Sequence, residues 1–358
     1  MKLQQFTGPV QAKGLEDTAF YRYHRLISLN EVGGQPQRFG LSVAGFHARN
    51  LKRQKKWPHT MTATATHDHK RGEDARARIN ILSEIPDDWR KAIRRWALLN
   101  RSKRSLVDGE YAPDRNDEYL FYQTLVGMWP LANDMPLADI KTRLTRYMHK
   151  AGKEAKVHTS WINPNNAYDM AVGKFIDKAL KPSMSNRFLD SFLSFHGRIA
   201  RMGAINSLAQ VLIKITSPGV PDTYQGCELW DFSLVDPDNR QPVDYDKRKH
   251  LLENLQPLLA VPGLEDREHR AELLLAMLDH WENGQIKLFV TACCLRFRRK
   301  HPDLFLEGDY LPLQVTGEQA DHVVAFARHA HGKFAITVAP RLVAGLMEPA
   351  LNWPVKPA

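Results

Sequence analysis

The feature that most constrains the fold of this chain is residues 61–78, MTATATHDHKRGEDARAR. After Met61 the first residues are small or β-branched, which favours a buried strand over a surface helix. This strand ends at His67 and Asp68, and charged residues follow directly. An α/β barrel places its active site at such strand ends. The alternative is that residues 66–78 simply begin a helix, with Asp68 as its cap and the charges on a solvated face.

A second strand exit of the same kind occurs later in the chain. Residues 185–215 carry Phe188, Phe192 and Phe195 at helical spacing, which predicts a long helix with a core-facing side. A short strand, residues 220–224, follows this helix, and polar and aromatic residues cluster after it at 225–231. Two such exits favour a barrel more than either one alone.

Composition narrows the class of protein. The formal charge of +10 raises nucleic-acid binding, with the densest basic runs at 52–56 and 296–300, but no nucleic-acid-binding motif accompanies them. Eight Trp and ten Tyr suit a carbohydrate platform equally well, although most such rings belong to a core. Three Cys cannot form a disulfide framework, which indicates a reducing compartment. Without an apolar run of membrane-spanning length or a signal peptide, we expect a cytoplasmic protein with no membrane association.

The pattern along the chain predicts four segments. Residues 1–79 hold two strand units. The first is an expected strand with a Gly-containing exit loop at 6–17, where the loop presents Lys13 and Glu16, and a helix is expected at 43–56. Residues 80–182 read as an all-helical insertion with helices at 86–100, 117–129, 137–157 and 165–180, which is too long for an ordinary barrel connection. Residues 183–300 return to the barrel, with further helices at 251–259, 267–281 and 285–300. Residues 301–358 alternate as strands do at 310–315, 322–328 and 333–339, which predicts a small C-terminal β domain, incomplete at its end.

Six stretches carry a resemblance to a known family. They are TGPVQAKGLEDTAFYRY (7–23), SLNEVGG (28–34), residues 64–78, DRNDEYLFYQTLVG (114–127), KVHTSWINP (156–164) and SPGVPDTYQGCELWDFSLVDPDNRQPVDY (217–245). Together they resemble the maltooligosyltrehalose synthases, which are (1→4)-α-D-glucan 1-α-D-glucosylmutases of the α-amylase clan. The resemblance covers most of residues 2–340.

The resemblance implies an α/β fold, a (β/α)8 barrel with a C-terminal β domain. Three carboxylates act at the strand ends of that barrel, and the His67–Asp68 pair resembles the third, on the seventh strand. Residues 6–14 would then be the sixth strand and residues 220–225 the eighth. The chain would be the C-terminal half of the enzyme, and its partner would be the missing N-terminal half. The nucleophile and the general acid have no convincing candidate, because the resemblance gives the pairs Glu16–Asp17 and Glu73–Asp74 no such role.

The resemblance also implies roles for individual residues in binding a maltooligosaccharide. Asp68 would be catalytic, hydrogen-bonding sugar hydroxyls and favouring the distorted ring, and His67 would donate to a neighbouring hydroxyl. Lys13 and Glu16 are candidates for gripping the freed glucose, with a surface salt bridge as the alternative for both. His69 stands where the family commonly has a small hydroxyl residue, and Gly72 where it has Ser, which puts the hydrogen bonds around Asp68 in doubt.

The remaining candidates have structural alternatives. Lys70 and Arg71 order the carboxylate cluster in one interpretation and pair with Glu73 or Asp74 in the other. Three residues at the second strand exit either contact sugar or form the wall: Tyr224, Gln225 and Glu228. No Cys/His set has zinc-like spacing, and the reaction needs no metal or redox centre, so we expect no cofactor.

Two other functions remain open at this point. The first is a catalytically dead glucan-binding or assembly protein, which fits a chain with only one of three carboxylates. The second is a basic nucleic-acid-binding protein.

Overall fold

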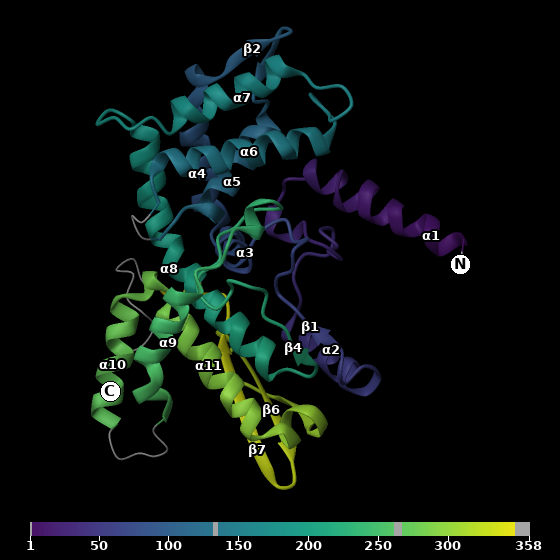
Figure 1. Cartoon of the computed structure of the whole chain (residues 1–358), viewed down its shortest axis with the longest axis vertical. Helices are drawn as coiled ribbons and strands as arrows, with labels where there is room; N and C mark the ends of the chain where they lie inside the picture. Colours follow the sequence, from purple (N-terminus) through teal and green to yellow (C-terminus); the bar gives the residue numbers. More distant parts are fainter. Residues whose placement is uncertain (1, 132–134, 261–266, 348–358) are drawn as a thin grey trace. The chain divides into compact units, whose positions relative to one another are not determined.

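The computed structural model describes residues 2–131, 135–260 and 267–347 (Figure 1). The chain divides into two compact units. The first comprises Met1–Arg38, Asp68–Gly203 and Phe232–Arg240, and the second comprises Phe39–His67, Ala204–Asp231 and Gln241–Ala358. The chain passes from the second unit to the first between His67 and Asp68. The end expected to be incomplete, residues 352–358, lies outside the described residues.

The first unit is built from helices and helical turns, with one short β-hairpin. Its elements are α1 (Lys2–Pro9), the π-helical η1 (Val10–Glu16), η2 (Ala19–Tyr21), η3 (Ile27–Leu29), α3 (Glu73–Asn80), η4 (Ile81–Ser83), α4 (Pro86–Asn100), η5 (Arg101–Lys103), β2 (Ser105–Val107), β3 (Glu110–Ala112), α5 (Arg115–Met128), α6 (Leu137–Ala155), α7 (Asn166–Ala179), the first part of α8 (Arg187–Thr216) and η6 (Asp238–Arg240).

An aromatic cluster around Trp96 of α4 forms the core of this unit. The indole of Trp96 is completely buried, and its Nε1 donates to Ser191 Oγ at 3.1 Å. The ring centroids of four residues lie 5.4 to 5.9 Å from it: Tyr122, Phe188, Phe192 and Phe195. The helix predicted at residues 86–100 and the core-facing side predicted on residues 185–215 therefore meet in one core.

Helix α3 is polar in sequence but buried in the structure. Glu73, Asp74 and Arg78 are each 1% exposed. The Arg78 guanidinium caps the carboxyl end of α5, donating to the carbonyls of Val126 at 3.2 Å and Trp129 at 2.7 Å. A cation is favourable at this position because the last carbonyls of a helix carry partial negative charge.

The second unit combines helices with two small sheets. Its elements are α2 (Val43–Lys56), β1 (Met61–Thr62), the last part of α8, β4 (Val220–Pro221), α9 (Tyr245–Ala260), α10 (Arg267–Asp279), η7 (Trp281–Asn283), α11 (Gln285–Lys300), the π-helical η8 (Asp303–Glu307), β5 (Asp309–Leu313), η9 (Ala320–His322), β6 (Val323–Ala330), β7 (Lys333–Pro340) and η10 (Val343–Gly345).

The strands β5, β6 and β7 form an antiparallel sheet, and α2 packs against one of its faces. Tyr310 of β5 connects the two layers: its hydroxyl lies 2.7 Å from His47 Nδ1, and its backbone N–H donates to Gln54 Oε1 at 2.9 Å. Phe46 and Phe326 add an apolar contact, with ring centroids 6.3 Å apart.

The strands β1 and β4 pair in parallel, with Met61 opposite Val220 and Thr62 opposite Pro221. The turn that leads into β4 needs glycine at position 219, where φ is +113° and an added Cβ would lie 2.8 Å from the Thr60 carbonyl oxygen. Arg298 fixes this turn from α11, donating to the carbonyls of Ile215 at 2.8 Å and Gly219 at 2.6 Å. The parallel pairing of the two predicted strand regions is thus present, over two residues of each strand.

Most predicted elements are confirmed, and four expectations are wrong. The helices predicted at 43–56, 86–100 and 285–300 have the observed bounds, and the three C-terminal strands are present. The block 80–182 is mainly helical but contains the β2–β3 hairpin. The strand expected at residues 6–17 is α1 followed by η1, in which only Glu16 is buried. A barrel strand must pair along its length, whereas a helix satisfies its backbone groups locally, so a segment without a paired neighbour adopts the helix.

The two remaining corrections concern the start of α3. Its N-cap is Gly72, with no side-chain cap, so Asp68 does not cap this helix. Its charges do not form a solvated face, because Glu73, Asp74 and Arg78 are buried. The alternative interpretation of residues 66–78 is therefore wrong both in making Asp68 a helix cap and in placing the charges on a solvated face.

Candidate functional site

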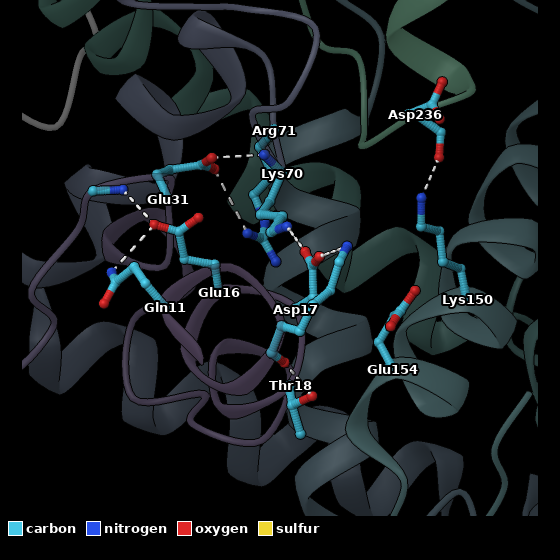
Figure 2. A network of polar contacts seen from close by, with 12 residues as sticks. Gln11, Glu16, Asp17, Thr18, Glu31, Lys70, Arg71, Lys150, Glu154 and Asp236 are labelled. Carbon is cyan, nitrogen blue, oxygen red and sulfur yellow. Dashed lines mark hydrogen bonds and ion pairs between the residues drawn. The ribbon is translucent and has the colours of Figure 1, made fainter. Parts of the chain in front are cut away.

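Asp17 is the centre of a polar network in the first unit (Figure 2). One carboxylate oxygen, Oδ2, accepts from Lys13 Nζ at 2.6 Å, and the other, Oδ1, accepts from Lys70 Nζ at 2.5 Å. Burial acts to raise the pKa of Asp17, but the hydrogen bonds from the two ammonium groups outweigh it and hold that pKa below its usual value. The same contact with Asp17 raises the pKa of Lys13. The three side chains form one ionised cluster.

Glu31 fixes the backbone from which Lys70 and Arg71 extend (Figure 2). The N–H of Lys70 donates to Glu31 Oε2 at 2.6 Å, and Glu31 Oε1 lies 3.8 Å from Arg71 NH1 and 3.9 Å from Arg76 Nε. Burial raises the pKa of Glu31 despite the neighbouring arginines. Arg71 is itself held by hydrogen bonds to the Ile27 carbonyl at 3.1 Å and to the Tyr147 hydroxyl at 2.6 Å.

Glu16 has a structural contact rather than an exposed carboxylate. Its side chain is 8% exposed, and Oε1 accepts from the Gly33 N–H at 2.9 Å and from Gln11 Nε2 at 3.4 Å. Glu16 therefore ties η1 to the glycine loop around residue 33, while Lys13, three residues earlier, is 76% exposed at its side chain. The structure separates the two candidates that the sequence treats alike.

His67 and Asp68 are exposed where the chain leaves the strand region. The charge of Asp68 acts on Lys13 in the same direction as Asp17, raising the lysine's pKa. His69 next to them is only partly exposed, and burial lowers its pKa to about 4, with Arg76 adding to the effect and Asp68 opposing it. This effect of Asp68 on the pKa of Lys13 is small, coming after those of Asp17 and Glu154.

A loop from the C-terminal side of the first unit supports the cluster. Arg71 forms a β-bridge with Leu234, and the Gly72 N–H donates to the Ser233 carbonyl at 2.8 Å. Helix α6 holds this loop in place: Arg143 makes a bidentate pair with Asp238, at 2.9 and 2.8 Å, and Lys150 Nζ donates to the Asp236 carbonyl at 2.6 Å (Figure 2). Lys70 and Arg71 are therefore braced from two sides, by Glu31 and by residues 233–234.

The residues after β4 lie in the second unit. Glu228 Oε2 accepts from Arg248 Nε at 3.0 Å, and the same arginine donates to the Gly226 carbonyl at 2.8 Å. Gln225 is exposed, and Tyr224 is partly exposed, with its carbonyl accepting from the Cys227 N–H at 3.0 Å. For Glu228 these contacts favour the wall-forming alternative, because its carboxylate already has a fixed cation.

One group among the described residues has metal-ligand types close together. Ligand atoms of Asp114, Asp117 and His158 lie within 4.8 Å of one another. Their atoms are engaged in internal bonds, since His158 Nε2 lies 2.9 Å from Asp114 Oδ2, and the Tyr168 hydroxyl donates to Asp117 Oδ2 at 2.6 Å. The group reads as a polar cap at the start of α5.

Sequence reasoning found Lys13, Lys70 and Arg71 but missed what holds them. It proposed Glu73 or Asp74 as partners, whereas the ammonium of Lys70 pairs with Asp17 and the guanidinium of Arg71 lies beside Glu31. The signal for Asp17 was its position four residues after Lys13, a spacing at which side chains meet on a helical segment. Glu31 gave a weaker signal, as one acidic residue within the otherwise uncharged stretch SLNEVGG.

The geometry can bind a neutral polyol. The ammonium groups of Lys13 and Lys70 and the carboxylates of Asp17 and Glu31 gather within one unit, and the side chains of Lys13 and Asp68 are exposed. Such groups can orient hydroxyls through hydrogen bonds. Within the described residues, no helix combines the length and the apolar character that a membrane span requires.

No protein-family model matches the chain. A curated Mycobacterium tuberculosis protein named putative maltooligosyl trehalose synthase is 41% identical over 330 residues, which cover 92% of this chain and 37% of that protein. The solved maltooligosyltrehalose synthase from Arthrobacter ramosus matches at 37% identity with a TM-score of 0.79, over 96% of this chain and 40% of the other. A hypothetical maltooligosyl trehalose synthase from Sulfolobus tokodaii matches at 37% identity with a TM-score of 0.76, over 95% and 41%. By sequence and by fold, the chain is therefore homologous to part of the maltooligosyl trehalose synthases, about two-fifths of their length.

Proposed function

We propose that this chain supplies the C-terminal half of a (1→4)-α-D-glucan 1-α-D-glucosylmutase. The observation that carries the proposal is the match to maltooligosyl trehalose synthases over 92% of the chain at 41% identity. The whole enzyme would cleave the reducing-end α-1,4 linkage of a maltooligosaccharide, hold the freed glucose, and rejoin it through its anomeric hydroxyl as an α,α-1,1 linkage. Water must be kept out during this exchange, or hydrolysis competes.

Asp68 is the catalytic residue that we assign to this chain. In a retaining glycosidase, hydrogen bonds to the sugar hydroxyls strengthen in the oxocarbenium-like transition state and supply several kcal/mol. The exposed carboxylate of Asp68 supports this role, since it does not cap α3. We assign His67 to a neighbouring hydroxyl of the same sugar.

The polar network around Asp17 would grip the freed glucose. Lys13 is the exposed lysine of the network, which supports direct sugar contact. Lys70 is the buried one, which supports an ordering role for Lys70 and its neighbour Arg71. We assign Glu16 a structural role in the site, because its carboxylate accepts a hydrogen bond from the Gly33 N–H. For Tyr224 and Gln225 we keep sugar contact as the proposal.

The nucleophile and the general acid would come from a partner, the N-terminal half of the barrel. A retaining mechanism needs two carboxyl groups about 5–5.5 Å apart on either side of the anomeric carbon. Glu73 and Asp74 cannot serve, because at 1% exposure they do not reach a substrate. The parallel pair β1–β4 supports the barrel interpretation, with these strands as the seventh and eighth.

A catalytically dead glucan-binding protein is the second candidate. What favours it is that the chain lacks a convincing nucleophile and acid of its own. Nucleic-acid binding is less well supported, because Arg53 and Arg298, one from each basic run, donate to backbone carbonyls within the second unit. Glucan-affinity electrophoresis beside a DNA-mobility assay at several salt concentrations separates these classes, since phosphate binding weakens steeply with salt and sugar binding does not.

The first prediction tests Asp68 in the whole enzyme, with this chain replacing the matching part of the Arthrobacter ramosus synthase. Asp68→Asn should leave thermal unfolding nearly unchanged and lower turnover of maltopentaose by orders of magnitude, because an amide cannot stabilise developing positive charge. Turnover is measured as loss of reducing ends. A variant with near-normal turnover would remove Asp68 from the catalytic machinery.

A further inference from the structure

We propose that Asp17 is a positioning residue, whose carboxylate holds the Lys13 ammonium beside Lys70 so that Lys13 meets the freed glucose in a fixed orientation. The inference rests on the proposed function and deepens it, since it names the residue through which the exposed lysine acts. Asp17 itself would make no contact with the reacting atoms.

The two lysines that bond Asp17 differ in exposure. Both bond the same carboxylate, at 2.6 Å for Lys13 and 2.5 Å for Lys70, on different oxygens. The Lys70 side chain is 5% exposed, that of Asp17 is 24% exposed, and that of Lys13 is 76% exposed. Lys70 is therefore the buried member of the cluster, Asp17 is partly exposed, and Lys13 is at the surface.

The backbones of Asp17 and Lys70 are held by contacts that do not involve the Lys13 side chain. The Asp17 N–H donates to the Ala12 carbonyl at 2.8 Å, and the Thr18 hydroxyl donates to the Lys13 carbonyl at 2.7 Å (Figure 2), which closes residues 12–18 on themselves. Lys70 is fixed at its backbone by Glu31. The Lys70 ammonium also bonds Asp17, but burial confines it, whereas the exposed Lys13 side chain depends on Asp17 for its position.

The bond to Asp17 orders the Lys13 side chain before a sugar binds. A lysine ammonium on a flexible four-carbon stem loses rotamer entropy when a ligand orders it. Bonded to Asp17, Lys13 has already lost that freedom, and it keeps two N–H donors for sugar hydroxyls. A pre-ordered donor retains the freed glucose longer. A larger fraction of the glucose is then rejoined to the glucan, and a smaller fraction escapes into water.

The predicted effect is therefore on the partition of products. Cleavage belongs to Asp68 and to the partner's carboxylates, and Asp17 touches neither the bond nor the anomeric carbon. Removing the carboxylate charge should let the glucose escape more often, and this shift in partition should exceed any fall in the rate of cleavage. A purely structural role for Asp17 would instead lower cleavage and rejoining together.

The experiment compares variants in the same chimera with the Arthrobacter ramosus synthase, measuring free glucose and trehalose-ended product from maltopentaose. Asp17→Asn should raise the share of free glucose about three- to tenfold, the effect of weakening one partly exposed hydrogen bond that loses its charge. Lys13→Met should do the same, the double variant should add nothing further, and Asp17→Glu should restore part of the partition. Asp177→Asn is the matched control, because it removes an exposed pair with Lys141 at 3.6 Å in the same unit.

The outcomes separate the inference from the function. An active chimera whose Asp17→Asn variant keeps the normal partition overturns the inference and leaves the function standing. An inactive unsubstituted chimera contradicts the proposed function, and the inference falls with it. A second measurement, NMR titration of lysine side chains in the chain itself, should show a lower Lys13 pKa in Asp17→Asn, and an unchanged pKa would mean that the two groups do not pair.

Discussion

Arg78 illustrates how single residues carry charge into this fold. Its guanidinium is held at 2.7 to 3.3 Å by three carbonyls at the end of α5, lies 2.9 Å from His196 Nε2, and covers the Phe232 ring at 3.8 Å. Burial lowers the pKa of Arg78 to about 9 and that of His196 well below its usual value, so the imidazole accepts rather than repels. Asp17 and Glu31 follow the same rule, because each buried charge has fixed polar partners.

His69 makes the stability of the chain sensitive to acid. Its pKa of about 4 in the folded state lies below the usual 6.5, because of burial and Arg76, while Asp68 and Glu73 oppose the shift. Between these values the unfolded state binds more protons, so the free energy of unfolding is intact above pH 6.5 and falls toward pH 4. In His69→Ser the free energy of unfolding should fall less steeply as the pH is lowered. The change in slope should be smaller than the one-proton limit of about 1.4 kcal/mol per pH unit, because the ring is partly exposed. Denaturant unfolding of both proteins from pH 4.5 to 7.5 checks this, and parallel curves would contradict it.

At the scale of elements, local pattern predicted most helices and the C-terminal strands, and it failed at residues 6–17. The stripe of Trp89 and Trp96 is visible within residues 86–100, and α4 has the predicted bounds. The strand expected at 6–17 depended on neighbours that a sequence pattern does not contain, and the segment is helical. The same limit applies to the site: the sequence supplied Lys13 and Lys70, but the carboxylate that joins them became visible only when residues 17 and 70 were placed together.

Gly219 tests how closely the turn before β4 approaches its neighbouring strand. Gly219→Ala places a Cβ 2.8 Å from the Thr60 carbonyl oxygen and 2.9 Å from Thr62 Cγ2, at a φ of +113°. Gly317→Ala is the matched control, since its φ is +107° and no atom lies within 4 Å of the added Cβ. The control should cost about 1–2 kcal/mol from the backbone conformation alone, and Gly219→Ala about 1–3 kcal/mol more from overpacking. Equal losses of unfolding free energy would show that the approach is not tight in solution.

At the scale of the whole molecule, the chain divides into two units and matches about two-fifths of its relatives' length. Of the residues to which we assign roles, Lys13, Asp68 and Lys70 belong to the first unit, and His67, Tyr224 and Gln225 belong to the second. The proposed reaction needs a nucleophile and an acid in addition to these residues. Activity should therefore depend on further sequence, outside the given residues, that supplies these two groups.

The most direct test of this account is incubation of the purified chain with maltopentaose, with and without the N-terminal part of a related synthase, scoring loss of reducing ends. The account predicts no conversion by the chain alone, because Asp68 and the lysine cluster cannot replace covalent capture of the glycosyl unit. It predicts conversion when the N-terminal part is added. Formation of the trehalose-ended product by the chain alone would contradict the account, and so would a correctly folded mixture of the two parts that leaves every reducing end intact.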